Sequence, residues 1–203
     1  MAVYKFSTNS LKTPLKYSSL LAGNTAYDPY TTTLAYDSIA SAAPSGTDTI
    51  TFSSIPGTYS SLKLIYTSQS TYTAYNTNVR MRFNGDTADN YGDRGIFTDG
   101  NTPYYLYSNG PRGWMDLNYG IQTGTYMASG WGVGEVDIPN YAATDVYKNA
   151  QGLAGVNALS YPAGYFSNAS GYWKSTAAIT SITLYSSSGN FVAGSRFSLF
   201  GVK

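Results

Sequence analysis

Short stretches in which apolar and polar residues alternate are the main pattern along this chain. In residues 79–83, valine, methionine and phenylalanine alternate with two arginines. A period of two places the apolar side chains on one face of a β-strand and the charged ones on the other. Residues 62–68 repeat the pattern, with two leucines and Tyr66 on one face and Lys63 and Ile65 on the other. The pattern predicts two strands that each turn one face toward a core.

Further strands are predicted at 48–53, 131–138, 152–159, 179–185 and 195–202. Glycine, proline and asparagine separate them, as expected of turns between strands. The last two stretches flank a Ser-Ser-Gly-Asn turn and are predicted to pair like a hairpin, which would lock the end of the chain into a sheet. No stretch has the pattern of a long helix. We therefore predict an all-β fold, an antiparallel two-sheet sandwich that is jelly-roll-like.

Residues 1–36 differ from the rest because they show neither a strand-like nor a helix-like period. One explanation is a frayed terminus. The other is an extended N-terminal arm that becomes ordered on a neighbouring subunit, and the apolar side chains in the segment favour this second explanation. The candidate particle-docking residues are Leu11, Leu15, Leu20 and Leu21. We therefore divide the chain into a docking arm, 1–36, and a β-sandwich domain, 37–203.

Residues 86–130 are rich in turn formers and aromatic residues, and we expect them to form long loops at one end of the sandwich. Exposed tyrosine and tryptophan rings can stack on sugars or anchor a protein partner. Aromatic side chains also fill cores, so each of these residues has a structural explanation as well. The candidates for contact with a receptor or glycan are Tyr104, Tyr105, Tyr107, Trp114 and Tyr119.

The composition indicates a protein with few surface charges. Charged residues make up 11% of the 203 residues, whereas about a quarter is usual, and tyrosine occurs 21 times. The net charge of +1 offers no electrostatic basis for binding nucleic acid, and no apolar run is long enough for membrane insertion. The first residues also lack the apolar core of a secretory signal. Such a composition suits recognition surfaces and tightly assembled particles.

Catalytic chemistry is restricted by the absence of histidine and cysteine. Ser–His–Asp and Cys–His catalysis and imidazole metal sites are excluded, and we expect no cofactor. Glu135 and Asp137 would project from one strand face at about 7 Å, a spacing that allows glycoside hydrolysis. A solvated strand face explains the same pair without catalysis. We expect a protein that is not an enzyme.

The acidic run 84–93 offers oxygen ligands for calcium on a turn-rich segment. The ligand order of an EF-hand is missing, and Asp and Asn also close turns by bonding their own backbone. We therefore expect no metal site. The calcium candidates, if an ion binds, are Asp86, Asp89, Asn90 and Asp93.

A set of short segments carries a further signal, at residues 49–64, 81–91, 138–142, 179–184 and 189–203. In this order they resemble a group of structural proteins of tailed bacteriophages, and the two last segments are the most characteristic. The resemblance touches most of the chain, although each segment is short. It implies a virion protein of β-sandwich fold, either a tail fibre or spike component or a head decoration (cement) protein.

The resemblance implies partners rather than a substrate. It implies that the arm attaches to other virion proteins, that the sandwich faces outward, and that the chain forms a homo-oligomer, with a trimer favoured. The expected location is the virion, assembled in the host cytoplasm, with a role in host attachment if the protein belongs to the tail. The group supplies no functional residues that can be carried over. The alternative is a carbohydrate-binding module that uses loop aromatics to bind a host-surface glycan.

Overall fold

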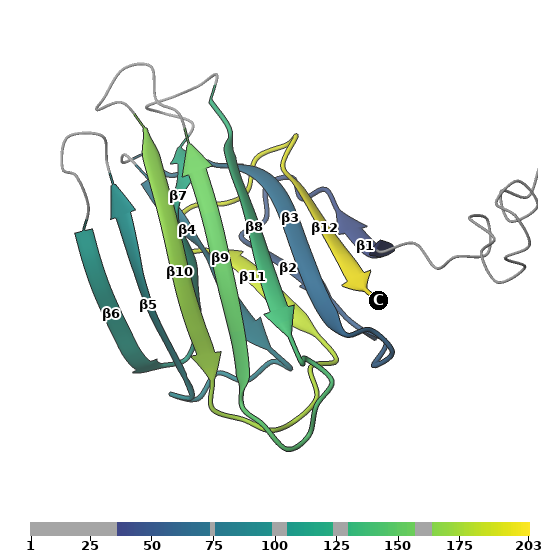
Figure 1. Ribbon diagram of the computed structural model, residues 1–203. Helices are drawn as coiled ribbons and strands as arrows, with labels where there is room; N and C mark the ends of the chain where they lie inside the picture. Colours follow the sequence, from purple (N-terminus) through teal and green to yellow (C-terminus); the bar gives the residue numbers. More distant parts are fainter. Residues whose placement is uncertain (1–35, 74–75, 99–104, 124–129, 157–163) are drawn as a thin grey trace, which may run out of the picture. The chain divides into compact units, whose positions relative to one another are not determined.

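The computed structural model describes residues 36–73, 76–98, 105–123, 130–156 and 164–203. These residues form twelve strands and no helix (Figure 1). The strands are β1 (Tyr36–Ala42), β2 (Thr49–Phe52), β3 (Ser61–Ser70), β4 (Asn76–Phe83), β5 (Tyr91–Thr98), β6 (Tyr105–Arg112), β7 (Met115–Thr123), β8 (Gly132–Pro139), β9 (Lys148–Val156), β10 (Tyr165–Trp173), β11 (Ile182–Ser186) and β12 (Arg196–Val202).

Two antiparallel sheets pack against each other (Figure 1). The eight-stranded sheet has the order β1-β12-β3-β8-β9-β10-β5-β6, and the four-stranded sheet has the order β2-β11-β4-β7. Within the described residues the one parallel pairing joins β3 to β7, through Gln69 with Gln122 and Ser70 with Thr123, and so connects the two sheets. The predicted all-β sandwich is confirmed.

The core lies between the sheets and consists of aliphatic and aromatic side chains. Alternate residues of β3 and β8 supply it from the eight-stranded sheet, and alternate residues of β4 and β11 supply it from the four-stranded sheet. The inward residues predicted for β3 and β4 are all buried, namely Leu62, Leu64, Tyr66, Val79, Met81 and Phe83. The period of two therefore identified the buried face of both strands correctly.

Two fully buried tyrosines connect loops to this core through their hydroxyl groups. The hydroxyl of Tyr91 accepts a hydrogen bond from the backbone N–H of Phe83 at 3.0 Å and donates to the carbonyl of the same residue at 3.2 Å. Burial raises the pKa of Tyr91, because the charged phenolate would lose its hydration. The hydroxyl of Tyr141 donates to the carbonyl of Pro56 and accepts from the N–H of Tyr59. Buried hydroxyls are tolerated because they are satisfied in this way.

The predicted hairpin of the last two strands is wrong. β11 pairs with β2 and β4 in the four-stranded sheet, whereas β12 pairs with β1 and β3 in the eight-stranded sheet. The connection between them carries the buried Phe191, which bridges to Thr47 and Ser70. Two strands with the same alternation can face one core from opposite sheets, so the pattern alone does not require them to be neighbours. The end of the chain is nevertheless held in a sheet, as predicted.

The expectation of long loops over residues 86–130 is also wrong, because this segment contains β5, β6 and β7. β5 and β6 form one edge of the eight-stranded sheet, and β7 forms one edge of the four-stranded sheet. Some inward positions of these strands carry aspartate, at Asp93 and Asp116, instead of an apolar residue. The apolar alternation is therefore absent there. β1 and β10 were not predicted either, and β1 begins at Tyr36, inside the segment assigned to the arm.

Candidate functional site

The aromatic candidates that the structure describes are packed inside the sandwich edge rather than presented as a platform. Tyr107 on β6 donates its hydroxyl proton to the carbonyl of Asp116 at 3.3 Å. Trp114, between β6 and β7, is half-buried beneath two guanidinium groups, Arg80 at 4.5 Å and Arg112 at 5.4 Å from the ring centroid. Tyr104 lies outside the described residues, as do the side chains of Tyr105 and Tyr119.

Two buried aspartates and two partly exposed arginines form an ionic network beside this tryptophan. Arg112 pairs with Asp93 and, at 3.0 Å, with Asp116. Arg80 pairs with Asp116 at 3.1 Å, and the N–H of Asp116 donates to Asp93 at 3.0 Å. Burial raises the pKa of Asp116, and the charges of Arg112 and Arg80 oppose that rise. We call these four residues the ionic latch, because they connect β5 and β6 to β4 and β7.

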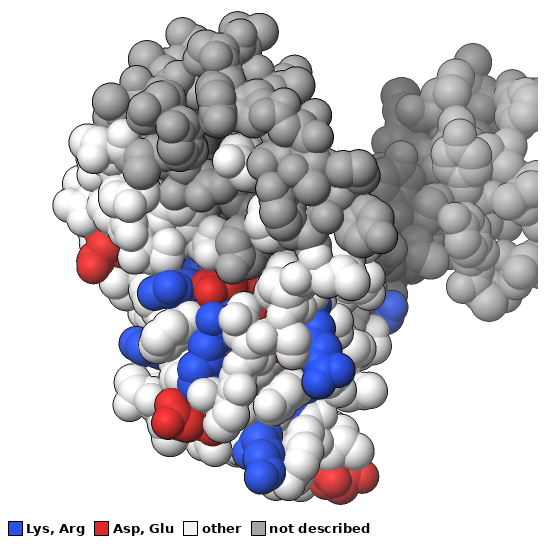
Figure 2. Space-filling model, turned by 90° about the vertical axis from the view of Figure 1, so that its left-hand side faces the viewer, with Lys and Arg blue, Asp and Glu red and all other residues white. Residues whose placement is uncertain are grey.

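The face of the molecule shown in Figure 2 has more basic than acidic side chains at its surface. Arg82 on β4 pairs with no carboxylate in the described part of the chain. Its Nε donates to the carbonyl of Gly113 at 2.8 Å, and its guanidinium lies 4.7 Å from the ring centroid of Tyr185. Arg82 is therefore held by an aromatic ring and by the backbone rather than by a carboxylate.

The four calcium candidates do not form one site. Asp86 accepts hydrogen bonds from the N–H of Ala88 at 2.9 Å, from Asn90 at 2.9 Å and from the indole of Trp173 at 2.7 Å. Burial would raise the pKa of Asp86, but these hydrogen bonds outweigh it and lower the pKa. Asp93 belongs to the ionic latch. Within the described residues no group of three or more His, Cys, Asp or Glu side chains is placed to hold a metal ion.

The carboxylates of Glu135 and Asp137 do lie on one face of β8, as predicted, and a single ammonium group connects them. Lys63 on β3 lies 3.1 Å from Glu135 and 3.2 Å from Asp137. Burial would lower the pKa of Lys63, but the hydrogen bonds to both carboxylates outweigh it and raise the pKa. The three groups form a salt bridge on the outer face of the eight-stranded sheet and carry one net negative charge.

The same outer face exposes a band of apolar side chains that we call the apolar strip. Each of six consecutive strands, from β3 to β6 in sheet order, contributes one of them. Their exposed fractions run from 39% for Leu153 to 75% for Leu106. A groove of about 450 Å³ crosses part of the strip. The six residues are Ile65, Val133, Leu153, Phe166, Ile96 and Leu106.

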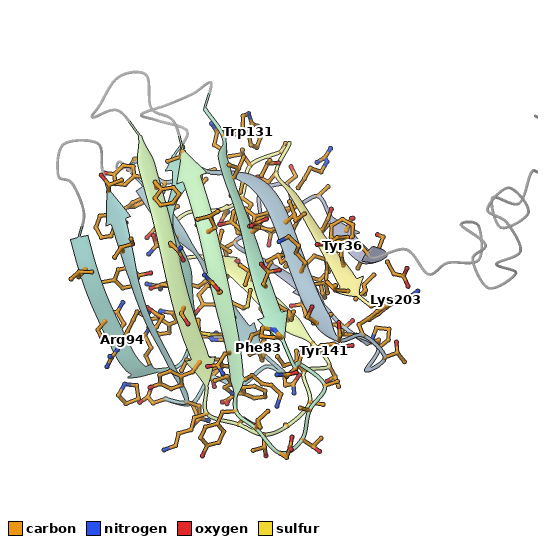
Figure 3. All side chains as sticks on the ribbon, in the orientation of Figure 1. Tyr36, Phe83, Arg94, Trp131, Tyr141 and Lys203 are labelled. Carbon is orange, nitrogen blue, oxygen red and sulfur yellow. The ribbon has the colours of Figure 1, made fainter. Side chains whose placement is uncertain are left out.

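Next to the strip is a polar pocket of about 300 Å³ over β9, β10, β5 and β6. The ring of Tyr172 lies directly on the backbone of Gly92, since a Cβ at that glycine would come within 2.6 Å of the ring. Arg94, which has no carboxylate partner in the described residues, lines the pocket near the end of the sheet opposite Trp131 (Figure 3). Its other polar side chains include Ser108, Asn109, Asn149 and Ser170. An aromatic ring among amide and hydroxyl groups is an arrangement suited to a sugar.

The residues of the strip and the pocket were not among the sequence-based candidates. β10 carries aromatic residues on both faces, with Phe166 and Tyr172 outward and Trp173 inward, so its sequence pattern does not identify the exposed face. The docking candidates Leu11, Leu15, Leu20 and Leu21 lie outside the described residues.

Comparisons with known proteins do not add to these observations, since no family model, no curated protein and no solved structure matches the chain. Among the described residues there is also no helix long and apolar enough to cross a membrane.

Proposed function

We propose that this chain is a non-enzymatic structural component of a tailed-phage virion, either a tail fibre or other tail-associated adhesion protein or a head decoration protein. In this proposal residues 1–36 attach it to the particle and the sandwich faces outward. The order of the resembling segments supports the phage assignment. The observation that carries the structural role is the apolar strip, because contiguous exposed apolar patches mark surfaces that contact other proteins.

The attachment and the location are tested together. Antibodies raised against the sandwich domain should label purified virions in immunogold electron microscopy, on the tail or on the head. Virus particles that lack the native protein are mixed with the added chain and sedimented. The full chain should sediment with these particles. A chain that lacks residues 1–30 should fold but should not sediment with them. Virions that carry no label anywhere would refute the virion proposal. A truncated chain that still binds particles would refute the arm alone.

The second candidate is a carbohydrate-binding module, and the polar pocket is the observation that favours it. An exposed tyrosine ring supported by a glycine backbone can stack on a sugar, and the surrounding amides and hydroxyls can bond its hydroxyl groups. Arg94 would favour a glycan that carries a carboxylate. This pocket takes the place of the loop aromatics as the glycan site.

A glycan array tests this candidate. Tyr172→Ala should remove binding, whereas Tyr147→Ala should not, because Tyr147 is a more exposed tyrosine that does not line the pocket. An array without any bound glycan, or a Tyr172→Ala variant that binds normally, would eliminate the pocket as a glycan site.

A further inference from the structure

The apolar strip is unusual for the outer face of an antiparallel sheet, which normally carries polar side chains toward water. Its six side chains together expose on the order of 500 Å², within the range of the largest apolar patches on monomeric proteins, which are often functional. Each partner buries roughly 800 Å² in an interface of standard size, so the strip alone would supply more than half of that area. The strip is therefore large enough for a stable contact with one other protein.

The strand registers arrange this face in rows. The middle row runs through Ile65, Glu135, Leu153, Asn168, Ile96 and Leu106. The row on one side of it runs through Thr67, Val133, Gly155, Phe166 and Thr98. The row on the other side runs through Lys63, Asp137, Gln151, Ser170 and Arg94.

We infer that the apolar strip is the contact between two copies of this chain, related by a two-fold axis that runs along β9. Such an axis places β8 on β10 of the second copy and β3 on β5 of the second copy. Leu153 then faces its own counterpart, and Val133 faces Phe166. Ile65 faces Ile96. The apolar positions of the two central rows thus meet one another, which is the self-complementarity that a two-fold contact requires.

The polar positions also match in this arrangement. Glu135 faces Asn168 of the second copy, and Asp137 faces Ser170, so each carboxylate meets a side chain that can donate a hydrogen bond. Arg94 faces Lys63 of the second copy, which is bonded to both carboxylates. Asp137 lies one strand away in the same row, so the guanidinium of Arg94 can share this carboxylate with Lys63. Aligned sheets cross at about 30°, which leaves long side chains room to adjust.

A two-fold axis that runs across the strands gives a poorer match. Placed between the two central rows, it would set Glu135 against Val133 of the second copy and Ile65 against Thr67. A carboxylate would then be buried on an apolar side chain, which is costly. The distribution of apolar side chains on the face therefore favours the axis along β9.

Cross-linking tests the contact, because the chain contains no cysteine and a single introduced thiol is unambiguous. Packed sheets lie about 10 Å apart, too far for a direct disulfide, so a short bismaleimide is the suitable reagent. Full-length Leu153→Cys should give at least about tenfold more covalent dimer than Thr51→Cys, because the contact holds its two thiols at a high effective concentration. Thr51 is exposed on β2 of the other sheet and serves as the matched control.

Sedimentation of the full chain over a concentration series should give a mass of two copies. Phe166→Lys should shift it to one copy with an unchanged melting temperature at low concentration, whereas Tyr147→Lys should remain dimeric. A single-copy mass at all concentrations would overturn the inference. So would a three-copy mass in which Leu153→Cys does not cross-link, a result that would favour the trimer expected from the resemblance.

Discussion

Removal of Arg112 from the ionic latch should be among the most damaging single substitutions in the sandwich. Its guanidinium pairs with both latch aspartates, whose side chains are only 0% and 3% exposed. In Arg112→Met the side chain keeps an unbranched apolar stem, but both carboxylates lose a cation, and Arg80 remains as the cation paired with Asp116. Breaking a buried ion pair by removing one partner costs about 3–5 kcal/mol, because the other charge stays buried without compensation.

That cost is large compared with the total stability of a domain, which is about 5–15 kcal/mol. For a chain of this length each kcal/mol lowers the melting temperature by about 2–4 °C, so we expect a decrease on the order of 10 °C. Urea denaturation followed by circular dichroism gives the free energy of unfolding. Arg196→Met is the matched control, because Arg196 is exposed and, within the described residues, its guanidinium donates to the carbonyl of Ser195 and pairs with no carboxylate.

A double variant distinguishes the cost of the uncompensated buried charge from the cost of lost side-chain packing. If the cost arises from the uncompensated carboxylates, then Asp93→Asn should restore part of the stability of Arg112→Met, since it removes one buried charge. A loss below about 1 kcal/mol in Arg112→Met would be the value of an exposed pair and would refute the buried-charge explanation. A double variant that is less stable than Arg112→Met would show that packing of the arginine stem dominates.

Three further substitutions test other parts of the fold. Burial raises the pKa of Asp116, so the contribution of this residue to stability is present below the ordinary pKa of an aspartate and is lost as the pH rises through the raised pKa. Urea denaturation at a series of pH values should show this decrease in stability. The substitution Asp116→Asn should remove the decrease. Tyr91→Phe should cost about 1–3 kcal/mol in denaturation experiments, because the buried N–H of Phe83 loses its acceptor. Gly134→Ala should cost about 1–3 kcal/mol and lower the melting temperature, because its Cβ would lie 2.4 Å from the ring of Tyr66.

Each of these three predictions can be contradicted by a specific result. A pH profile that is unchanged in Asp116→Asn would assign the titration to another group. A Tyr91→Phe variant as stable as the parent would show that water replaces the hydroxyl. Gly57→Ala is the control for the third substitution, because a Cβ there would meet only Ala142, at 3.8 Å. Equal effects of the two alanine substitutions would attribute the loss to the backbone rather than to Tyr66.

The strands that could be predicted are those whose inward positions carry large apolar residues. In residues 62–66 of β3 and 79–83 of β4 each inward residue is one that favours a core by itself, so a local pattern was sufficient. In β5 and β7 the buried positions include Asp93 and Asp116, which are acceptable only because Arg112 lies beside them in the fold. The carboxylates are 23 residues apart in sequence and are brought together by sheet pairing. A local pattern contains no information on such a partner, and these strands were therefore interpreted as loops.

The candidate surface was missed for a related reason. Each strand from β3 to β6 in sheet order exposes a single apolar side chain of the strip, and isolated exposed apolar residues are normal on protein surfaces. The strand register brings these single side chains together into a strip. Ile65 and Leu153, for example, lie in one row because β8 pairs with both of their strands. A shift of β8 by one residue would exchange its outward and inward faces and bury Glu135 and Asp137 in the core. The register that forms the core therefore also forms the strip, and a substitution in β8 can change the strip without altering the core only at its outward positions, such as Val133.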